Sequence, residues 1–137
     1  MPDTTIRKSI FLKADPATVW DYLTDPEKLA IWFHKPQSPL AKGPYEMFGT
    51  ESGDKLMWGD VLVCEPHERL HYTFTIKPLG DRVTTVKWTL SAVEGGTNLS
   101  LEHEGLADIE ESFGLTLALD KGWDDHIGRM RADIHAV

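Results

Sequence analysis

The sequence predicts an α+β fold, in which one long C-terminal helix lies across an antiparallel sheet of about six strands. Residues 115–137 carry apolar side chains at spacings of four, four, three and four, which define one face of a helix: Leu119, Trp123, Ile127, Met130 and Ile134. Much of the remaining chain alternates apolar and polar residues, which is typical of short strands with one buried face. The connections between these strands are short, so consecutive strands are expected to pair antiparallel.

The first part of the chain is predicted to form one strand and two short helices. Residues 4–12 are rich in β-branched side chains and read as a strand. Asp-Pro at 15–16 supplies an N-cap and a favourable first helical position, which predicts a helix over 16–23. Asp-Pro recurs at 25–26 and predicts a second helix of two turns. Three prolines and a glycine make residues 34–44 a loop.

Five further strands are predicted after this loop, over residues 45–50, 56–64, 69–76, 83–93 and 97–104. Gly59 interrupts the second of them, where we expect a bulge or the close approach of another backbone. Residues 105–117 are either a loop or a short helix that leads into the long one. Gly122 lies directly before Trp123 and either permits a close approach or marks a bend.

Length and charge limit the classes of protein to consider. A chain of 137 residues is long enough for one domain with one core. It carries 14 basic against 22 acidic side chains, a net charge of −8, which argues against binding to nucleic acid or to an anionic membrane. The N-terminus has no apolar run of signal-peptide length, so a cytoplasmic location is expected. Cys64 is the single cysteine, and its apolar strand context favours a buried thiol over a nucleophile.

Four segments carry a resemblance to a known family: 14–33, 61–74, the pair 83–90 and 96–105, and Gly122-Trp123. With the order of elements, they make the chain similar to the START-like (SRPBCC) superfamily, in the branch of the activator of heat-shock-protein (Hsp90) ATPase homologue. The resemblance implies the helix-grip fold, a curved antiparallel sheet around the C-terminal helix, as a single domain over 1–137. It also implies a cavity between helix and sheet that holds an apolar or amphipathic small molecule.

Side-chain alternation places several aromatic residues of the strands on the face that meets the long helix. His126 lies three residues after Trp123, at the edge of the helical stripe, and the second short helix is placed to close the mouth of the cavity. The candidate ligand-binding residues are therefore Trp32, Phe33, Tyr72, Phe74, Trp88, His103, Trp123 and His126. The alternative for each aromatic residue is ordinary core packing.

His103 stands at the end of an apolar register and has two interpretations. It is either a hydrogen-bonding or acid–base group within the cavity, or a histidine at the rim that water or a strand neighbour satisfies. No cofactor and no metal are expected. His67 and His71 would lie about 13 Å apart on a strand, too far to share one ion. The sequence has no GxSxG, HExxH or phosphate-binding glycine loop.

The sequence leaves three hypotheses for the function. The first, and the one it favours, is a binding domain for a hydrophobic small-molecule ligand. The second is a cyclase- or hydrolase-like enzyme that uses the same cavity, with a general base among Tyr72, His103 and His126. The third is an interaction module that regulates a chaperone ATPase, since the resembling family contains ligand binders, proteins that act on polyketide-like substrates, and chaperone assistants. Exposed edge strands would also permit a homodimer.

Overall fold

The computed structural model describes residues 5–77, 83–106 and 112–136, and the side chains of its last helix from residue 117 onward. The elements follow in the order β1 (Ile6–Leu12), α1 (Pro16–Thr24), α2 (Pro26–Trp32), β2 (Lys35–Pro36), β3 (Gly43–Phe48), β4 (Lys55–Glu65), β5 (Arg69–Phe74), β6 (Thr84–Val93), β7 (Gly96–Glu104) and α3 (Ser112–Ile134).

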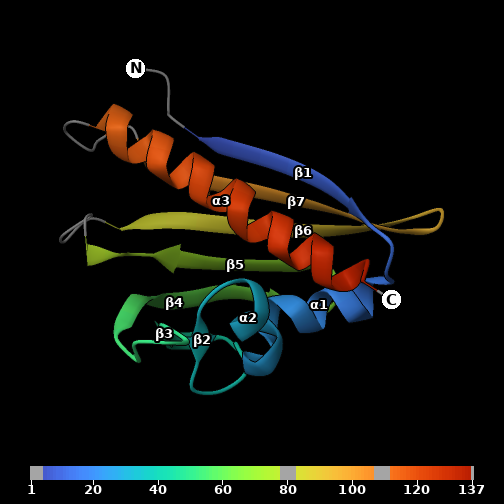
Figure 1. Ribbon diagram of the computed structural model, residues 1–137, viewed down its shortest axis with the longest axis horizontal. Coiled ribbons are helices and arrows are strands. Elements are labelled where there is room, and N and C mark those ends of the chain that lie inside the picture. Colours follow the sequence, from blue (N-terminus) through green and yellow to red (C-terminus); the bar gives the residue numbers. More distant parts are fainter. Residues whose placement is uncertain (1–4, 78–82, 107–111, 137) are drawn as a thin grey trace.

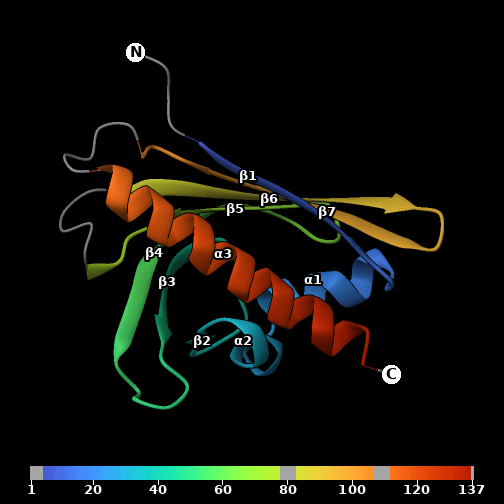
Figure 2. The ribbon, with the colours of Figure 1, turned by 45° about the horizontal axis from the view of Figure 1, so that its top comes forward.

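The strands form one antiparallel sheet in the order β1-β7-β6-β5-β4-β3-β2. Strands β3 to β7 follow one another as hairpins, as the short connections predicted, and β1 joins the far edge beside β7. Helix α3 runs diagonally over one face of this sheet (Figure 1). Strands β3 and β4 turn out of the plane of the others, so the sheet curves around α3 (Figure 2). The predicted α+β architecture is confirmed.

Helix α3 buries the stripe that its spacing predicted. Trp123, Ile127, Met130 and Ile134 are buried against the sheet and the short helices, and Leu119 is half-buried. The helix runs without interruption for 23 residues, so Gly122 neither ends it nor separates two helices. A Cβ atom added to Gly122 would have no neighbour within 4 Å, so the expected close approach at this glycine is wrong.

The structure adds three details that the sequence prediction did not contain. The predicted loop 34–44 contains the two-residue strand β2, paired with β3 at the edge of the sheet, where a proline costs no ladder hydrogen bond on its outer side. Helix α3 begins at Ser112, within the segment 105–117 left open above, while residues 107–111 lie outside the described part. The Asp25 side chain makes no capping bond to α2, and the Asp25 N–H bonds Asp21 O at the end of α1.

Gly59 is a point of close approach between β4 and β5, as expected. A Cβ atom there would lie 2.4 Å from the Thr73 carbonyl oxygen. The Tyr45 hydroxyl crosses this gap and donates to Thr73 O at 2.6 Å, and the Asp60 N–H bonds the Thr73 hydroxyl at 2.8 Å. The interruption therefore ties β3, β4 and β5 together through side chains.

No helix within the described ranges is long and apolar enough to cross a membrane.

Candidate functional site

The space between α3 and the sheet is filled mainly by aromatic side chains. Trp32, Tyr72 and Trp88 are each at most 2% exposed. The Trp32 indole N–H donates to Tyr22 O at 2.7 Å, and the Trp88 indole N–H donates to the Tyr72 hydroxyl at 3.0 Å. Trp88 also meets Trp123 edge to face, with ring centroids 5.6 Å apart. These residues form a packed core in which the indole N–H groups of Trp32 and Trp88 are hydrogen-bonded.

His103 lies within a chain of hydrogen bonds that joins α3 to three strands. Its ring is completely buried. The Trp123 indole N–H donates to His103 Nδ1 at 3.0 Å, so this nitrogen carries no proton. The proton of the neutral ring is therefore on Nε2, which lies 2.7 Å from the Thr84 hydroxyl oxygen. Thr84 in turn donates to Phe74 O at 2.8 Å, and burial lowers the pKa of His103 to about 4.

Both nitrogens of His103 are thus used within the protein. A ring in this position is a structural connector, because accepting a proton at Nδ1 would direct it against the indole N–H of Trp123. The interpretation as a wet histidine at the rim is wrong, although its partner Thr84 is, as proposed, on the neighbouring strand. His103 does act as a hydrogen-bonding group, but both of its partners, Trp123 and Thr84, belong to the protein.

A cavity of about 120 Å³ remains at one end of this aromatic core. It lies between the end of α2, the end of β5 and the N-terminal half of α3. Its walls are mostly apolar, and two histidines stand among them: Phe33, His34, Phe74, Ile76, Ala118, Leu119, Gly122, Trp123 and His126. Phe33 stacks on Trp123 with ring centroids 5.4 Å apart. The cavity therefore offers flat aromatic walls for a ring.

The two histidines of this cavity lie next to each other. The rings of His34 and His126 are 5.5 Å apart and edge to face, and Phe33 stacks on His34 at 4.5 Å. Burial is the main cause that lowers the pKa of both histidines, that of His34 to about 4, and the neighbouring charge of Arg129 adds to it. Among the described residues, no group of three or more histidine, cysteine or acidic side chains is placed to hold a metal ion.

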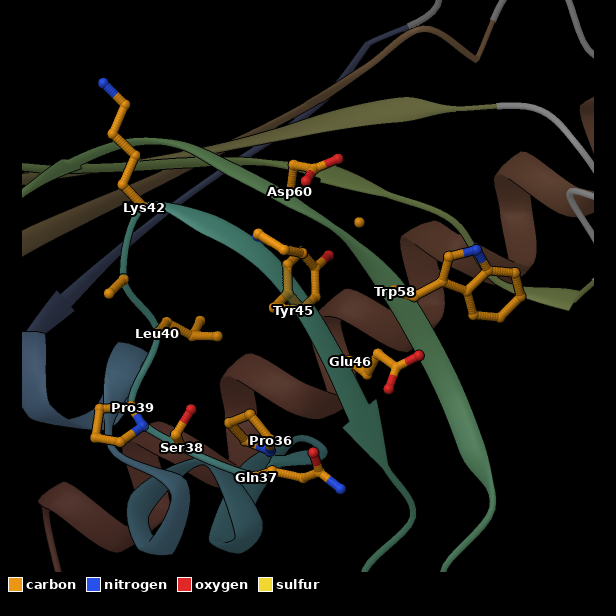
Figure 3. A pocket seen from close by; sticks show the side chains of 13 residues that line it. Pro36, Gln37, Ser38, Pro39, Leu40, Lys42, Tyr45, Glu46, Trp58 and Asp60 are labelled. Carbon is orange, nitrogen blue, oxygen red and sulfur yellow. The ribbon is translucent and has the colours of Figure 1, made fainter.

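A wider groove of about 530 Å³ lies between strands β3 and β4 and the loop before β3 (Figure 3). Loop residues 36–42 form one wall, and Tyr45, Glu46, Trp58 and Asp60 form the other. Asp60, Glu46 and Lys42 are exposed, and the Tyr45 hydroxyl is already bonded to Thr73 O. The groove is large enough for a drug-sized molecule, but no buried side-chain nitrogen or oxygen of the described residues is left unpaired to bind it.

The comparisons with known proteins decide the family. Residues 13–133 match the model of the family described as activator of Hsp90 ATPase homolog 1-like protein. The chain belongs to this family. Its membership confirms the resemblance found in the sequence, and the helix-grip fold with it. No curated protein matches this family member significantly by sequence.

Solved structures of similar fold come from several bacteria. CalU16 from Micromonospora echinospora is 26% identical, with a TM-score of 0.78, and the match covers 97% of this chain and 75% of that one. Protein CV1439 from Chromobacterium violaceum is 29% identical, with a TM-score of 0.70 and 96% of each chain covered. The Aha1 dimer from Colwellia psychrerythraea is 16% identical, with a TM-score of 0.76 and 96% of each chain covered, and supports the fold alone.

Of the eight residues predicted for the site, the structure brings four to the cavity of this family member: Phe33, Phe74, Trp123 and His126. The other four, Trp32, Tyr72, Trp88 and His103, are buried deeper and pack beside or beneath these walls. The sequence analysis missed His34, because it stands in a stretch read as loop. It also missed Arg129, which lies on a polar face of α3 and reaches His126 from the next turn.

Proposed function

We propose that this protein binds a small organic molecule with an apolar ring in the cavity between α3, α2 and β5, as one START-like domain. The observation that carries the proposal is the cavity itself, with Phe33, Phe74 and Trp123 in its walls. Every buried side-chain nitrogen and oxygen of the described residues already has a hydrogen-bond partner. Binding in the interior would therefore come from apolar burial, at about 25 cal/mol per Å².

The size of the cavity limits the ligand. Pockets for drug-sized molecules measure about 300–1,000 Å³. A dry cavity of about 150 Å³ is enough to bind benzene. At about 120 Å³, the cavity of this protein suits a single ring, with any substituent extending through the opening beside the two histidines.

The proposal is tested with toluene as a probe and with two matched glycine variants of α3. Gly122 lines the cavity, and Gly128 does not. An added Cβ atom meets nothing within 4 Å at either position. We expect Gly122→Met to fill the cavity and weaken toluene binding at least about tenfold, because its side chain takes the place of the ring. Gly128→Met should bind toluene as the wild type does.

The measurement is an NMR titration followed at the Trp123 indole N–H signal. Failure of toluene to perturb this signal in the wild type would contradict the proposal. Equal loss of toluene binding in both variants would contradict it too, because the loss would then come from a disturbed helix α3 and not from a filled cavity. Native mass spectrometry of the freshly purified protein then identifies a natural ligand, if one is retained, by a discrete excess mass.

An enzyme acting in the same cavity is the second candidate, favoured by one observation. His126 lines the cavity, and among the described residues only its Nδ1 atom has hydrogen-bond partners, so Nε2 is available to a bound molecule. A general base needs such a nitrogen within hydrogen-bond reach of the substrate. Turnover lost in His126→Gln with ring binding retained would favour this candidate.

The third candidate, an interaction module that regulates a chaperone ATPase, rests on the family description alone. A homodimer would agree with the dimeric Aha1 from Colwellia psychrerythraea, which has the same fold. A surface interaction should be retained in Gly122→Met, so the same variant separates this candidate from ligand binding. A cytoplasmic location stays part of the proposal, consistent with the unpaired thiol of Cys64.

A further inference from the structure

Two histidines line the cavity, and an arginine stands beside one of them. His34 follows α2, and His126 and Arg129 lie one turn apart on α3. His34 and His126 line the cavity themselves. Arg129 stands directly behind His126, with its Nη2 atom 2.6 Å from His126 Nδ1. Two separate elements therefore bring imidazoles to this apolar cavity, with a guanidinium beside one of them.

The hydrogen bonds at this rim leave a donor unused. His126 Nδ1 lies 3.0 Å from Trp32 O, which can only accept, and 2.6 Å from Arg129 Nη2, which can only donate. One nitrogen cannot serve both partners at the same time. With the proton on Nδ1, the Arg129 N–H lacks an acceptor. With the proton on Nε2, Nδ1 accepts from Arg129, and the His126 Nε2–H has no hydrogen-bond acceptor among the described residues.

The acidic side chains nearest to Arg129 along α3 are paired elsewhere. Arg129 forms no ion pair with a carboxylate of the described residues. Asp125, one turn before it, is paired with Lys121 at 3.1 Å, and Asp133, one turn after it, accepts from the Tyr22 hydroxyl at 2.5 Å. His34 makes no hydrogen bond with another described residue. Arg129 therefore keeps its positive charge without a carboxylate in contact, while the charge of Asp125 acts on His126.

We propose that His34, His126 and Arg129 form an anion site at the opening of the cavity, which binds the carboxylate or phenolate oxygen of a ring-bearing ligand. This inference rests on the proposed function, because the ring occupies the cavity that Phe33 and Trp123 line. The oxygen atoms of the ligand accept from the guanidinium and from the imidazoles, bonds that are roughly twice as strong as neutral ones. The ligand class is thus an aromatic acid or an acidic phenol.

The test compares benzoate with benzamide, which has nearly the same shape and no charge. We expect wild-type protein to bind benzoate about tenfold more tightly than benzamide, the equivalent of one added hydrogen bond to a charged group. Arg129→Gln should remove most of this preference and leave toluene binding within about twofold. His34→Leu should act in the same direction. Each affinity is measured by NMR titration at the Trp123 indole N–H.

The matched control is Arg131→Gln. Arg131 is exposed on another face of α3, and its loss changes the net charge of the protein by the same amount. This variant should keep the preference for benzoate. Equal affinity for benzoate and benzamide in a wild-type protein that binds toluene would overturn the anion site and leave the proposed function intact. An equal effect of Arg131→Gln and Arg129→Gln would also overturn it, because the preference would then be a general effect of charge.

Discussion

His103 is neutral in the fold because of what its two nitrogens contact. Nδ1 accepts from the Trp123 indole, Nε2 donates to the Thr84 hydroxyl, and the Thr84 hydroxyl donates to Phe74 O. Each donor in this chain has one acceptor, so adding a proton to the ring would break it. The same contacts make His103 a link between α3 and the sheet.

This arrangement predicts a pH dependence of stability. The pKa of His103 is lowered from 6.5 to about 4 in the folded state, so the unfolded chain binds the extra proton between these values. The contribution of His103 is complete above about pH 6.5 and is lost as the pH falls toward 4, by about 3 kcal/mol in total. Urea unfolding across this range should show a steeper loss in the wild type than in His103→Gln. Parallel curves for the two proteins would contradict the prediction.

Thr84→Val tests the same chain from its other end. Valine has the shape of threonine, but it would leave the His103 N–H without an acceptor, at a cost of about 2 kcal/mol in the free energy of unfolding. Thr85→Val is the control, because Thr85 is only half-buried and faces the other side of the sheet; we expect a change within about 0.5 kcal/mol. Urea unfolding measures both variants. A similar loss of stability in the two would mean that valine disturbs strand β6 in general, and that the hydrogen bond to His103 is not the cause.

At the scale of the elements, the pairing of β4 with β5 depends on Gly59. A side chain there would collide with the Thr73 backbone at 2.4 Å, and backbone cannot move aside cheaply. We expect Gly59→Ala to lower the free energy of unfolding by about 2 kcal/mol. Gly128→Ala on the exposed face of α3 should raise it by up to about 1 kcal/mol, because alanine favours the helix. Thermal unfolding measures both, and a neutral Gly59→Ala would mean that the strands are not this close.

For the whole molecule, the position of α3 on the sheet depends on contacts spread along its length. Lys8 of β1 bridges Asp120 and Asp124 at 2.7 and 2.9 Å, the Trp123–His103 bond anchors the middle, and Tyr22 of α1 holds Asp133 near the end. Lys8 is the most buried of the ion-paired side chains of the described residues, with 19% of its side chain exposed. The middle of α3 and its C-terminal end are therefore held by different elements.

Lys8→Gln tests the contribution of the first of these contacts. We expect a loss of about 1 kcal/mol, since both carboxylates are partly exposed and would repel each other one turn apart on α3. About 1 M salt should reduce the difference from wild type, because it screens charges beyond about 3 Å. Hydrogen exchange of the α3 amides should be faster in the variant at low salt. Unchanged exchange would mean that burial of the stripe alone positions this part of α3.

The sequence was enough to predict the order of every element except β2, and the buried faces of β5, β6, β7 and α3. These follow from periods of 2 and 3.6, which are local properties of a strand and a helix. The packing of the folded chain separates residues that share one pattern. Tyr72 and Phe74 alternate on the same face of β5, yet Tyr72 packs in the closed core with Trp88 and His103, and Phe74 lines the cavity. His34, His126 and Arg129 meet because α2 ends beside α3, and that contact depends on how the two helices pack, which no local period encodes.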